Sequence, residues 1–491
     1  MASTESVRAA RTVADQLDDG YKWKAFSAVG LSLFTMVMSF SIIFLGLSPI
    51  ADDFGITLRA VTWVVISQSL TISAVMLPLG RVSDIIGRKK FHLAGLALFL
   101  GGAIFCAVSP NLPVLLGARV VMAVGAAMGQ AVSTAIITSV FPAHERGLGL
   151  GSQSTAVAIG AASGPIFAGV LLHFWGWQSL FVAMAIPSAI AFVWGWRILD
   201  DSRIGSTDTS VRRPPYDWVG ALLSASGMVL LVITINNPLN MTWDSPFMLG
   251  GMGGALAIFG VFVRWELRTP SPMLDLRLFA NTVYRYAVAT RFLAFMGITA
   301  TMFMMPVFLQ NLRGVSNIST GGIMFLNAAG MGIAAQASGR LSDRFGHRRF
   351  TFLGLAILIV TSVVFSTISR DTPLGVIMPT LFFNGIGMGM WGAPNMSATM
   401  SAVPRTAYGA VSAFVNLTRN VGNVTGQAIT AAIITGVMLA RGFDIQLSAV
   451  ADTPGAADAF LSGWRTAYIV VVVFAVLAAV TAVMTRDSRN R

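Results

Sequence analysis

Long apolar segments separated by short polar ones recur along this chain of 491 residues and constrain its fold more than any other feature. A bilayer core of about 30 Å is crossed by about 20 apolar residues in a helix. Because that core holds no water, each backbone polar group must bond within its segment, which favours helices. About fourteen such spans are predicted, each within a few residues, at 25–47, 61–79, 92–108, 113–139, 147–172, 178–196, 217–236, 247–265, 285–309, 318–337, 350–368, 374–397, 407–436 and 464–485. The sequence therefore predicts an all-α integral membrane protein.

The composition supports a membrane protein and argues against a nucleic-acid partner. Only 11% of the residues are charged and 55% are hydrophobic, whereas a soluble domain carries about 25% charged residues. The net charge of +12 comes from bases in short loops rather than from one basic face or tail. The single cysteine, Cys106, allows no internal disulfide. We expect the lipid bilayer and a small-molecule substrate as partners, and no nucleic acid.

Lysine and arginine are distributed unequally between alternate loops. With the N-terminus placed in the cytoplasm, 24 of the 33 fall in inside segments and 5 in outside segments. The remaining ones are Arg119, Arg285, Arg291 and Arg419. Cytoplasmic loops carry an excess of these residues. We therefore predict a multi-pass protein of the bacterial inner membrane with both termini in the cytoplasm.

A charged motif occurs twice and divides the chain. GRVSDIIGRKK, residues 80–90, returns as GRLSDRFGHRR, residues 339–349, and each copy falls between the second and third predicted helix of a half. Duplicated halves with a site between them are typical of secondary transporters. The sequence predicts a six-helix bundle in 1–200, a linker with two further spans in 201–275, and a second six-helix bundle in 276–491.

Five motifs, in order along nearly the whole chain, resemble the major facilitator superfamily and its fourteen-helix drug:proton antiporter branch. The repeated motif is similar to that family's cytoplasmic signature, and GARVVMAVGAAMGQA resembles its helix-4 signature. GAASGPIFAG resembles the helix-5 signature associated with antiporters, and FPAHERG and NLTRNVGNVTGQA also fit. The resemblance implies a transporter, with protons as a candidate coupling partner. The four histidines are scattered and no metal-ligand spacing such as H-E-x-x-H occurs, so we expect no enzyme activity, no cofactor and no bound metal ion.

The repeated motif also has a physical interpretation. Gly80 and Gly87 permit a tight backbone turn. Asp84 can accept hydrogen bonds from a helix N-terminus or pair with a base such as Arg88. The resemblance implies that these four residues, with Asp343 of the second copy, form a conformational latch between the halves. The alternative is that the motif only anchors topology, which is the interpretation preferred for its terminal Lys pair.

The helix-5 motif supplies Gly160, Gly164, Pro165 and Gly169. Small residues with one proline make a smooth, kinked face against which another helix can lie closely. Ordinary helix contact and the sealing of one side of a transport pathway are both consistent with this pattern.

Three arginines lie inside predicted spans. A cation in a span is costly and usually faces a cavity or a partner, although a long side chain can also reach the interface. Arg119 lies in the outer portion of an inward-running helix, which argues against such an interfacial position. We predict that Arg119, Arg291 and Arg419 act on substrate or coupling ion, together with Trp391 and Asn395.

A departure from the antiporter pattern concerns acidic residues. That branch typically carries an Asp nine residues before a Pro in helix 1, whereas Phe40 stands nine residues before Pro49 here. No acid lies well inside a predicted span, and Asp217 and Glu266 lie at span ends. Exchange of protons for cations normally needs a buried carboxylate. We therefore predict a carrier of a small aromatic solute, neutral or anionic, for example a vitamin such as a flavin taken up by the cell. The alternative is a proton-coupled multidrug efflux antiporter, which the helix-5 motif favours.

Overall fold

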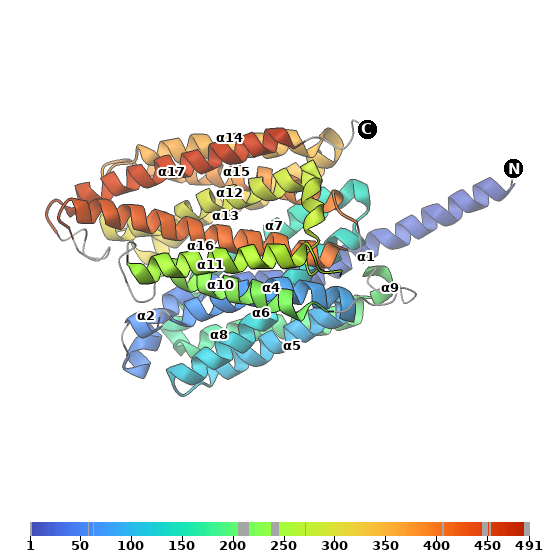
Figure 1. The fold of residues 1–491 in the computed structure, drawn as a ribbon, viewed down its shortest axis with the longest axis horizontal. Helices are drawn as coiled ribbons and strands as arrows, with labels where there is room; N and C mark the ends of the chain where they lie inside the picture. Colours follow the sequence, from blue (N-terminus) through green and yellow to red (C-terminus); the bar gives the residue numbers. More distant parts are fainter. Residues whose placement is uncertain are drawn as a thin grey trace.

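The computed structural model describes residues 2–56, 58–61, 63–204, 216–236, 245–270, 272–404, 407–443, 450 and 453–485. Within them the chain forms α-helices and no strand (Figure 1). Residues 205–215 of the predicted linker lie outside the described residues. The α-helices are α1 (Ala2–Ser41), α2 (Ile43–Phe54), α3 (Leu58–Val61), α4 (Trp63–Ile86), α5 (Arg88–Ala107), α6 (Leu112–Val140), α7 (Arg146–Trp175), α8 (Gln178–Ile198), α9 (Asp201–Ile204), α10 (Trp218–Asn236), α11 (Pro246–Glu266), α12 (Thr282–Val307), α13 (Asn317–Phe345), α14 (His347–Ser366), α15 (Leu374–Ser401), α16 (Tyr408–Ala440) and α17 (Ala456–Met484). Short helical turns occur at η1 (Ala143–Glu145), η2 (Leu276–Ala280) and η3 (Phe308–Leu312).

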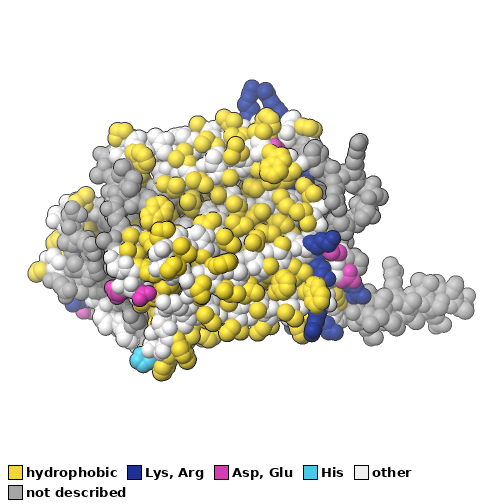
Figure 2. Space-filling view, turned by 90° about the horizontal axis from the view of Figure 1, so that it is seen from below, with side chains coloured by type: hydrophobic (Ala, Val, Ile, Leu, Met, Phe, Trp, Pro, Cys, Tyr) yellow, Lys and Arg dark blue, Asp and Glu magenta, His cyan; other side chains and the backbone are white. Residues whose placement is uncertain are grey.

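Thirteen described helices are long and apolar enough to cross a bilayer, and the remaining predicted span, 318–337, lies within α13. The predicted all-α membrane fold is confirmed. Figure 2 shows one face of the bundle covered by hydrophobic side chains, with Lys and Arg gathered mainly at the end where the chain termini lie. Side chains such as Phe105 and Leu222 are 63% and 71% exposed. Large exposed apolar surfaces of this kind suit contact with lipid.

The helices form two groups that meet along one seam. We call α1–α9 the first half and α12–α17 the second half. In the first half α5 lies against α6 and α8, and in the second half α13 and α14 lie against α15. Across the seam α13 packs against α7, and α16 packs against α4 and α6. The pair α10 and α11 lies on the outside of this seam, where α10 contacts both α4 and α16.

The two copies of the repeated motif have the same backbone conformation. Gly87 follows α4 with φ 107°, and Gly346 follows α13 with φ 93°. Residues with a Cβ rarely adopt positive φ, so glycine is needed at both turns. Gly80, predicted to serve the turn, instead lies within α4 and is buried.

The first predicted span, 25–47, differs from the structure. The first long helix ends at Ser41 and a second begins at Ile43, so the helix is interrupted at Ile42 within the predicted span. The interruption is local, because Ile42 keeps helical dihedral angles and its N–H still donates to the Met38 carbonyl oxygen at 2.9 Å. Hydropathy alone cannot locate such an interruption, since the residues on both sides of it are apolar.

Candidate functional site

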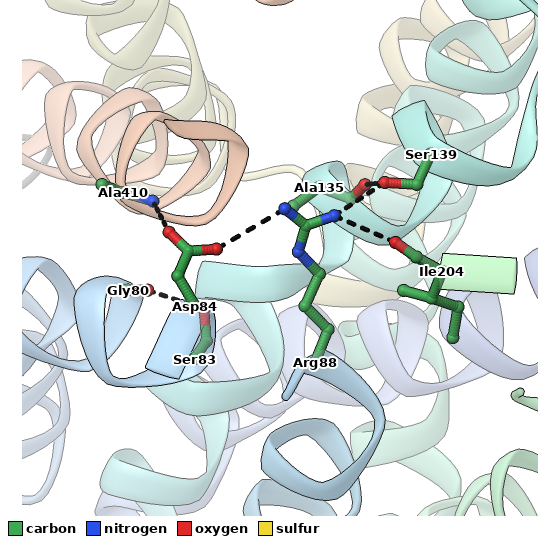
Figure 3. A network of polar contacts seen from close by, with 8 residues as sticks. All are labelled: Gly80, Ser83, Asp84, Arg88, Ala135, Ser139, Ile204 and Ala410. Atoms are coloured by element: carbon green, nitrogen blue, oxygen red, sulfur yellow. Dashed lines mark hydrogen bonds and ion pairs between the residues drawn. The ribbon is translucent and has the colours of Figure 1, made fainter. Parts of the chain in front are cut away.

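Asp84 and Arg88 of the first repeated motif lie at the seam between the halves (Figure 3). Asp84 Oδ2 accepts a hydrogen bond from the Ala410 N–H at 3.1 Å, and Oδ1 pairs with Arg88 Nη2 at 3.5 Å. The buried Arg88 also donates to Ser139 Oγ at 2.7 Å and to the Ile204 carbonyl oxygen at 3.2 Å. Asp84 therefore joins α4 to the start of α16 through a charge-assisted bond.

Asp343 of the second motif makes the reverse contact. Its Oδ1 accepts from the Gly147 N–H at 3.1 Å, and its Oδ2 accepts from the Leu148 N–H at 3.3 Å. Neither α7 nor α16 is capped locally, because Glu145 and Ala407 at their N-cap positions make no side-chain cap bond. The first N–H groups of a helix lack intrahelical partners and carry partial positive charge. Each acid thus caps a helix of the opposite half, and we call these contacts the first (Asp84) and second (Asp343) cross-half caps.

Glycines allow the close approach that both caps need. A Cβ on Gly80 would overlap Ala413 of α16, and a Cβ on Gly339 would overlap the carbonyl oxygen of Gly147. Both overlaps fall well inside the 3.0 Å limit that real Cβ atoms respect. The requirement for glycine at these two crossings is therefore steric and comes from the opposite half.

Further contacts join the two caps at one end of the bundle. The Arg146 guanidinium, at the start of α7, lies 5.8 Å from the ring centroid of Tyr408, at the start of α16. Lys22 of α1 forms an ion pair with Glu145, directly before α7. The two capped helix starts are thus neighbours, and both copies of the repeated motif lie at the same end of the molecule.

A second cluster lies deeper in the seam, around Arg291 and Arg419. Arg291 is 5% exposed, donates from Nε to the Val415 carbonyl oxygen at 3.2 Å, and lies 5.0 Å from the Phe295 ring centroid. Arg419 Nη2 donates to Gln130 Oε1 of the first half at 2.8 Å. Val415 lies one helical turn before Arg419 on α16, so the two guanidinium groups are close enough for their charges to interact. Among the described residues, neither forms a salt bridge with a carboxylate.

Trp391 and Asn395 of α15 border the same cluster. The Trp391 ring packs edge-on against Phe295 at 5.3 Å, and Asn395 Nδ2 donates to the Ala287 carbonyl oxygen of α12 at 3.0 Å. Trp391 Nε1, Asn395 Oδ1 and Gln130 Nε2 are buried and have no hydrogen-bond partner within the described part of the chain. The cluster thus offers cations, donors and an acceptor beside aromatic faces, a combination typical of sites for small organic ligands.

Arg119 does not belong to that cluster. It is 1% exposed and lies inside the first half, where Nε donates to the Val64 carbonyl oxygen at 3.2 Å. Its Nη2 donates to Gln68 Oε1, and Gln68 Nε2 donates in turn to Ser39 Oγ at 2.8 Å. The Phe181 ring centroid lies 5.7 Å from its guanidinium. The structure therefore separates the predicted arginines into two places, with Arg119 joining α6 to α4 and α8.

The helix-5 glycines differ from one another in their surroundings. A Cβ on Gly160 would lie 2.6 Å from the Phe34 carbonyl oxygen, and a Cβ on Gly164 would lie 2.7 Å from the backbone nitrogen of Ile42. Both therefore permit contact between α7 and the first span, and Gly164 does so where α1 ends. Gly169 has no atom within 4 Å of the corresponding position, and Pro165 lies inside α7.

Comparison with known proteins identifies the family to which this architecture belongs. A family model described as Major Facilitator Superfamily matches residues 29–427. The chain belongs to the Major Facilitator Superfamily. It is 28% identical to the riboflavin transporter RibZ of Clostridioides difficile, over 83% of this chain and 87% of that one. It is also 28% identical to the multidrug resistance protein Stp of Mycobacterium tuberculosis, over 83% and 75% respectively. A solved structure of the proton:xylose symporter XylE with two Trp substitutions has a TM-score of 0.64 at 15% identity, covering 96% of this chain and 97% of that one.

Membership of this superfamily makes the protein a multi-pass membrane transporter. Members of the superfamily bind small-molecule substrates. Besides Asn395, which was predicted, further amides lie inside the spans and were not predicted from the sequence. Asn416 Nδ2 donates to the carbonyl oxygens of Gln130 and Ser412 at 3.0 Å each, and Gln153 Nε2 donates to Thr134 Oγ1 at 3.0 Å. Uncharged amides inside apolar spans are the signal that identifies them in the sequence. No group of three or more potential metal ligands occurs among the described residues.

Proposed function

We propose that this transporter is a secondary carrier of a small aromatic organic solute, neutral or anionic, and that it works by alternating access. The observation that carries the proposal is the pair Arg291 and Arg419, whose charges interact at the seam without a carboxylate among the described residues. Two cations repel each other strongly where the dielectric is low. An anionic group bound between them offsets that repulsion, and Phe295 and Trp391 supply aromatic faces beside it.

The two cross-half caps support alternating access. Both are formed in this structure, and both join the halves at the end where basic side chains gather. Basic loops favour the cytoplasmic side of a membrane. We infer that this conformation is closed on the cytoplasmic side of a bacterial inner membrane, and that both termini lie on the cytoplasmic side. Release of Asp84 and Asp343 from the opposing helices opens the cytoplasmic end.

The relatives support two candidate cargoes. RibZ, a riboflavin transporter by name, supports a flavin, whose ring system and polar substituents suit the Arg291 cluster. Stp and the drug efflux pump JefA, which is 27% identical, support the alternative of a proton-coupled multidrug efflux antiporter. The close contacts of Gly160 and Gly164 also favour that alternative, because the helix-5 motif is associated with antiporters. The charge of the substrate and the direction of transport distinguish a flavin carrier from a multidrug efflux antiporter.

Transport by purified protein in proteoliposomes tests the proposal. The probes are riboflavin, riboflavin 5′-phosphate and the permanent cation ethidium, each with and without an imposed pH gradient. We expect flavin transport, with Arg291→Gln weakening the apparent affinity for the phosphate by roughly tenfold to hundredfold, the value of a lost charge-assisted hydrogen bond. Arg285→Gln, an exposed position on the same helix, is the matched control. Gradient-driven export of ethidium that Arg291→Gln leaves unchanged would establish the efflux alternative.

A further inference from the structure

Two carboxylates meet at the foot of the inserted helices α10 and α11. Asp217 directly precedes α10 and is 9% exposed, and Glu266 ends α11 and is 3% exposed. Asp217 Oδ2 and Glu266 Oε1 lie 2.5 Å and 2.7 Å from the same point, the position that a Cβ on Gly220 would occupy. Two buried carboxylates this close cannot both be ionised without strong repulsion. The arrangement therefore favours one proton held by the pair.

The hydrogen bonds distinguish the two acids. Asp217 Oδ1 accepts from the Gly220 N–H at 2.8 Å, and both of its oxygens accept from Trp265 Nε1 at 3.0 Å. Glu266 Oε2 accepts from the Leu274 N–H at 3.3 Å, whereas its buried Oε1 has no hydrogen-bond partner among the residues described. A protonated carboxyl gains a donor. Glu266 Oε1, which accepts no hydrogen bond among the described residues, is therefore the oxygen of the pair best suited to carry a proton.

Water can reach Glu266. Glu266 lines a hollow of about 180 Å³ together with Thr269, Pro270, Asp275 and Arg277. A single water needs only about 10–15 Å³ of such space. The hollow thus provides a route by which a proton enters or leaves Glu266 without crossing the helix bundle.

One arginine lies between the pair and the first cross-half cap. Arg81 stands three residues before Asp84 on α4, the helix that the foot of α10 contacts, and its charge acts on Asp84 and, more weakly, on Glu266. Its buried Nε has no hydrogen-bond partner in the described part of the chain. Tyr216 also ties this foot to α4, through a hydrogen bond from its hydroxyl to the Pro78 carbonyl oxygen at 3.4 Å. The charged and titratable groups around Glu266 are therefore Asp217 and Tyr216 at the foot of α10, Arg81 of α4, and Asp275 and Arg277 across the hollow.

We propose that Asp217 and Glu266 form a proton-binding site, and that a proton bound there strengthens the first cross-half cap through Arg81. Protonation removes one negative charge near Arg81. The net positive potential at Asp84 therefore rises, which favours the ionised form of Asp84. An ionised Asp84 makes the stronger, charge-assisted bond to the Ala410 N–H. By thermodynamic reciprocity, opening the cap weakens proton binding and releases the proton into the hollow.

Infrared difference spectroscopy of the purified full-length protein tests proton binding directly. We expect the carbonyl band of a buried carboxylic acid to titrate between about pH 5 and pH 9, because burial and a nearby like charge can raise the pKa of a carboxyl group into that range. Glu266→Gln should abolish this band and Asp217→Asn should shift it. Asp275→Asn, across the same hollow, should leave it in place. A wild type without the band, or a band that survives in both pair variants, overturns the site.

Pulsed electron paramagnetic resonance tests the coupling to the cap. Spin labels at the exposed positions Ile86 and Ser401, with Cys106 replaced by Ala, report the separation of the halves at this end. We expect acidification across the titration to raise the ratio of closed to open molecules by at least about fivefold. Arg81→Gln should remove this response and keep the infrared band. A response that is absent in the wild type, or that persists in Arg81→Gln, overturns the coupling. Neither measurement uses a substrate, so both are independent of the cargo proposed above.

Discussion

A single methyl group at Gly339 should force the two halves apart at the capped end. The Cβ of Gly339→Ala would overlap the backbone carbonyl oxygen of Gly147, which cannot rotate away as a side chain can. Overpacking of this kind costs about 1–3 kcal/mol. If α7 moves away, the Asp343 bonds to Gly147 and Leu148 are also lost, and one charge-assisted bond contributes about 1.5–3 kcal/mol. A shift of about 3 kcal/mol in the balance between closed and open forms corresponds to more than a hundredfold change in population.

Cysteine labelling in native membranes measures that shift. Ser83 lies on the opposite half from Gly339 and is 0% exposed while the caps are formed. In a Cys106→Ala background, Ser83→Cys should react slowly with a membrane-permeant maleimide, and Gly339→Ala should raise the rate at least about tenfold, because separated halves expose α4.

Gly322→Ala on the same helix is the control. No atom lies within 4 Å of its added Cβ, so it reproduces the change in helix propensity without the steric overlap. Equal labelling rates in the two alanine variants would show that the crossing at Gly339 does not hold the end closed, and would refute the steric argument.

Three further predictions concern topology, the capping acids and Arg119. Single cysteines at Ile86 and Phe345, which are 49% and 59% exposed, should react in intact cells with a permeant reagent only; reaction with an impermeant reagent would reverse the topology. Asp84→Asn and Asp343→Asn should each weaken one cap by about 1.5–3 kcal/mol and raise labelling of Ser83→Cys, whereas Asp53→Asn at the Trp177 contact should not. Arg119→Met should lower the thermal unfolding temperature, because the Val64 carbonyl oxygen and Gln68 Oε1 lose their donor at about 1–3 kcal/mol each. Arg119→Lys should restore part of that loss, and an unchanged unfolding temperature for Arg119→Met would show that those bonds do not stabilise the first half.

The apolar runs predicted the membrane spans well because lipid imposes one requirement on every spanning segment. The repeated motif indicated that Asp84 could accept hydrogen bonds from a helix N-terminus or pair with a base, and in the structure it does both. The same kind of contact by Asp343 was not predicted. The partners themselves could not be predicted. Ala410 and Leu148 contribute backbone N–H groups, which every residue except proline carries, so their side chains give no signal of the contact.

The distribution of arginines was harder to predict for a different reason. Arg119 and Arg291 occupy similar settings in the sequence, each a cation among apolar residues. Which neighbour a helix face meets depends on rotation and on contacts with other helices, and a span that is apolar all round does not encode its rotation. The structure assigns Arg119 to Val64 and Gln68 and assigns Arg291 to Val415 of the seam. Pairing partners of this kind follow from tertiary structure alone.

The cross-half caps constrain the receiving helices through space rather than through side-chain chemistry. Ala410 and Leu148 donate backbone N–H groups that any residue except proline carries. The neighbouring Gly409 and Gly147 are restricted instead, because a Cβ on either would overlap Asp84 or the Gly339 carbonyl oxygen. Further along α16, Asn416 and Arg419 face the seam and its amide groups. One helix therefore meets the opposite half in two ways, by close backbone approach at its capped end and by side-chain hydrogen bonds in its inner segment. Substitutions at residues 416–419 would alter the side-chain contacts across the seam while leaving the backbone donors of the cap in place.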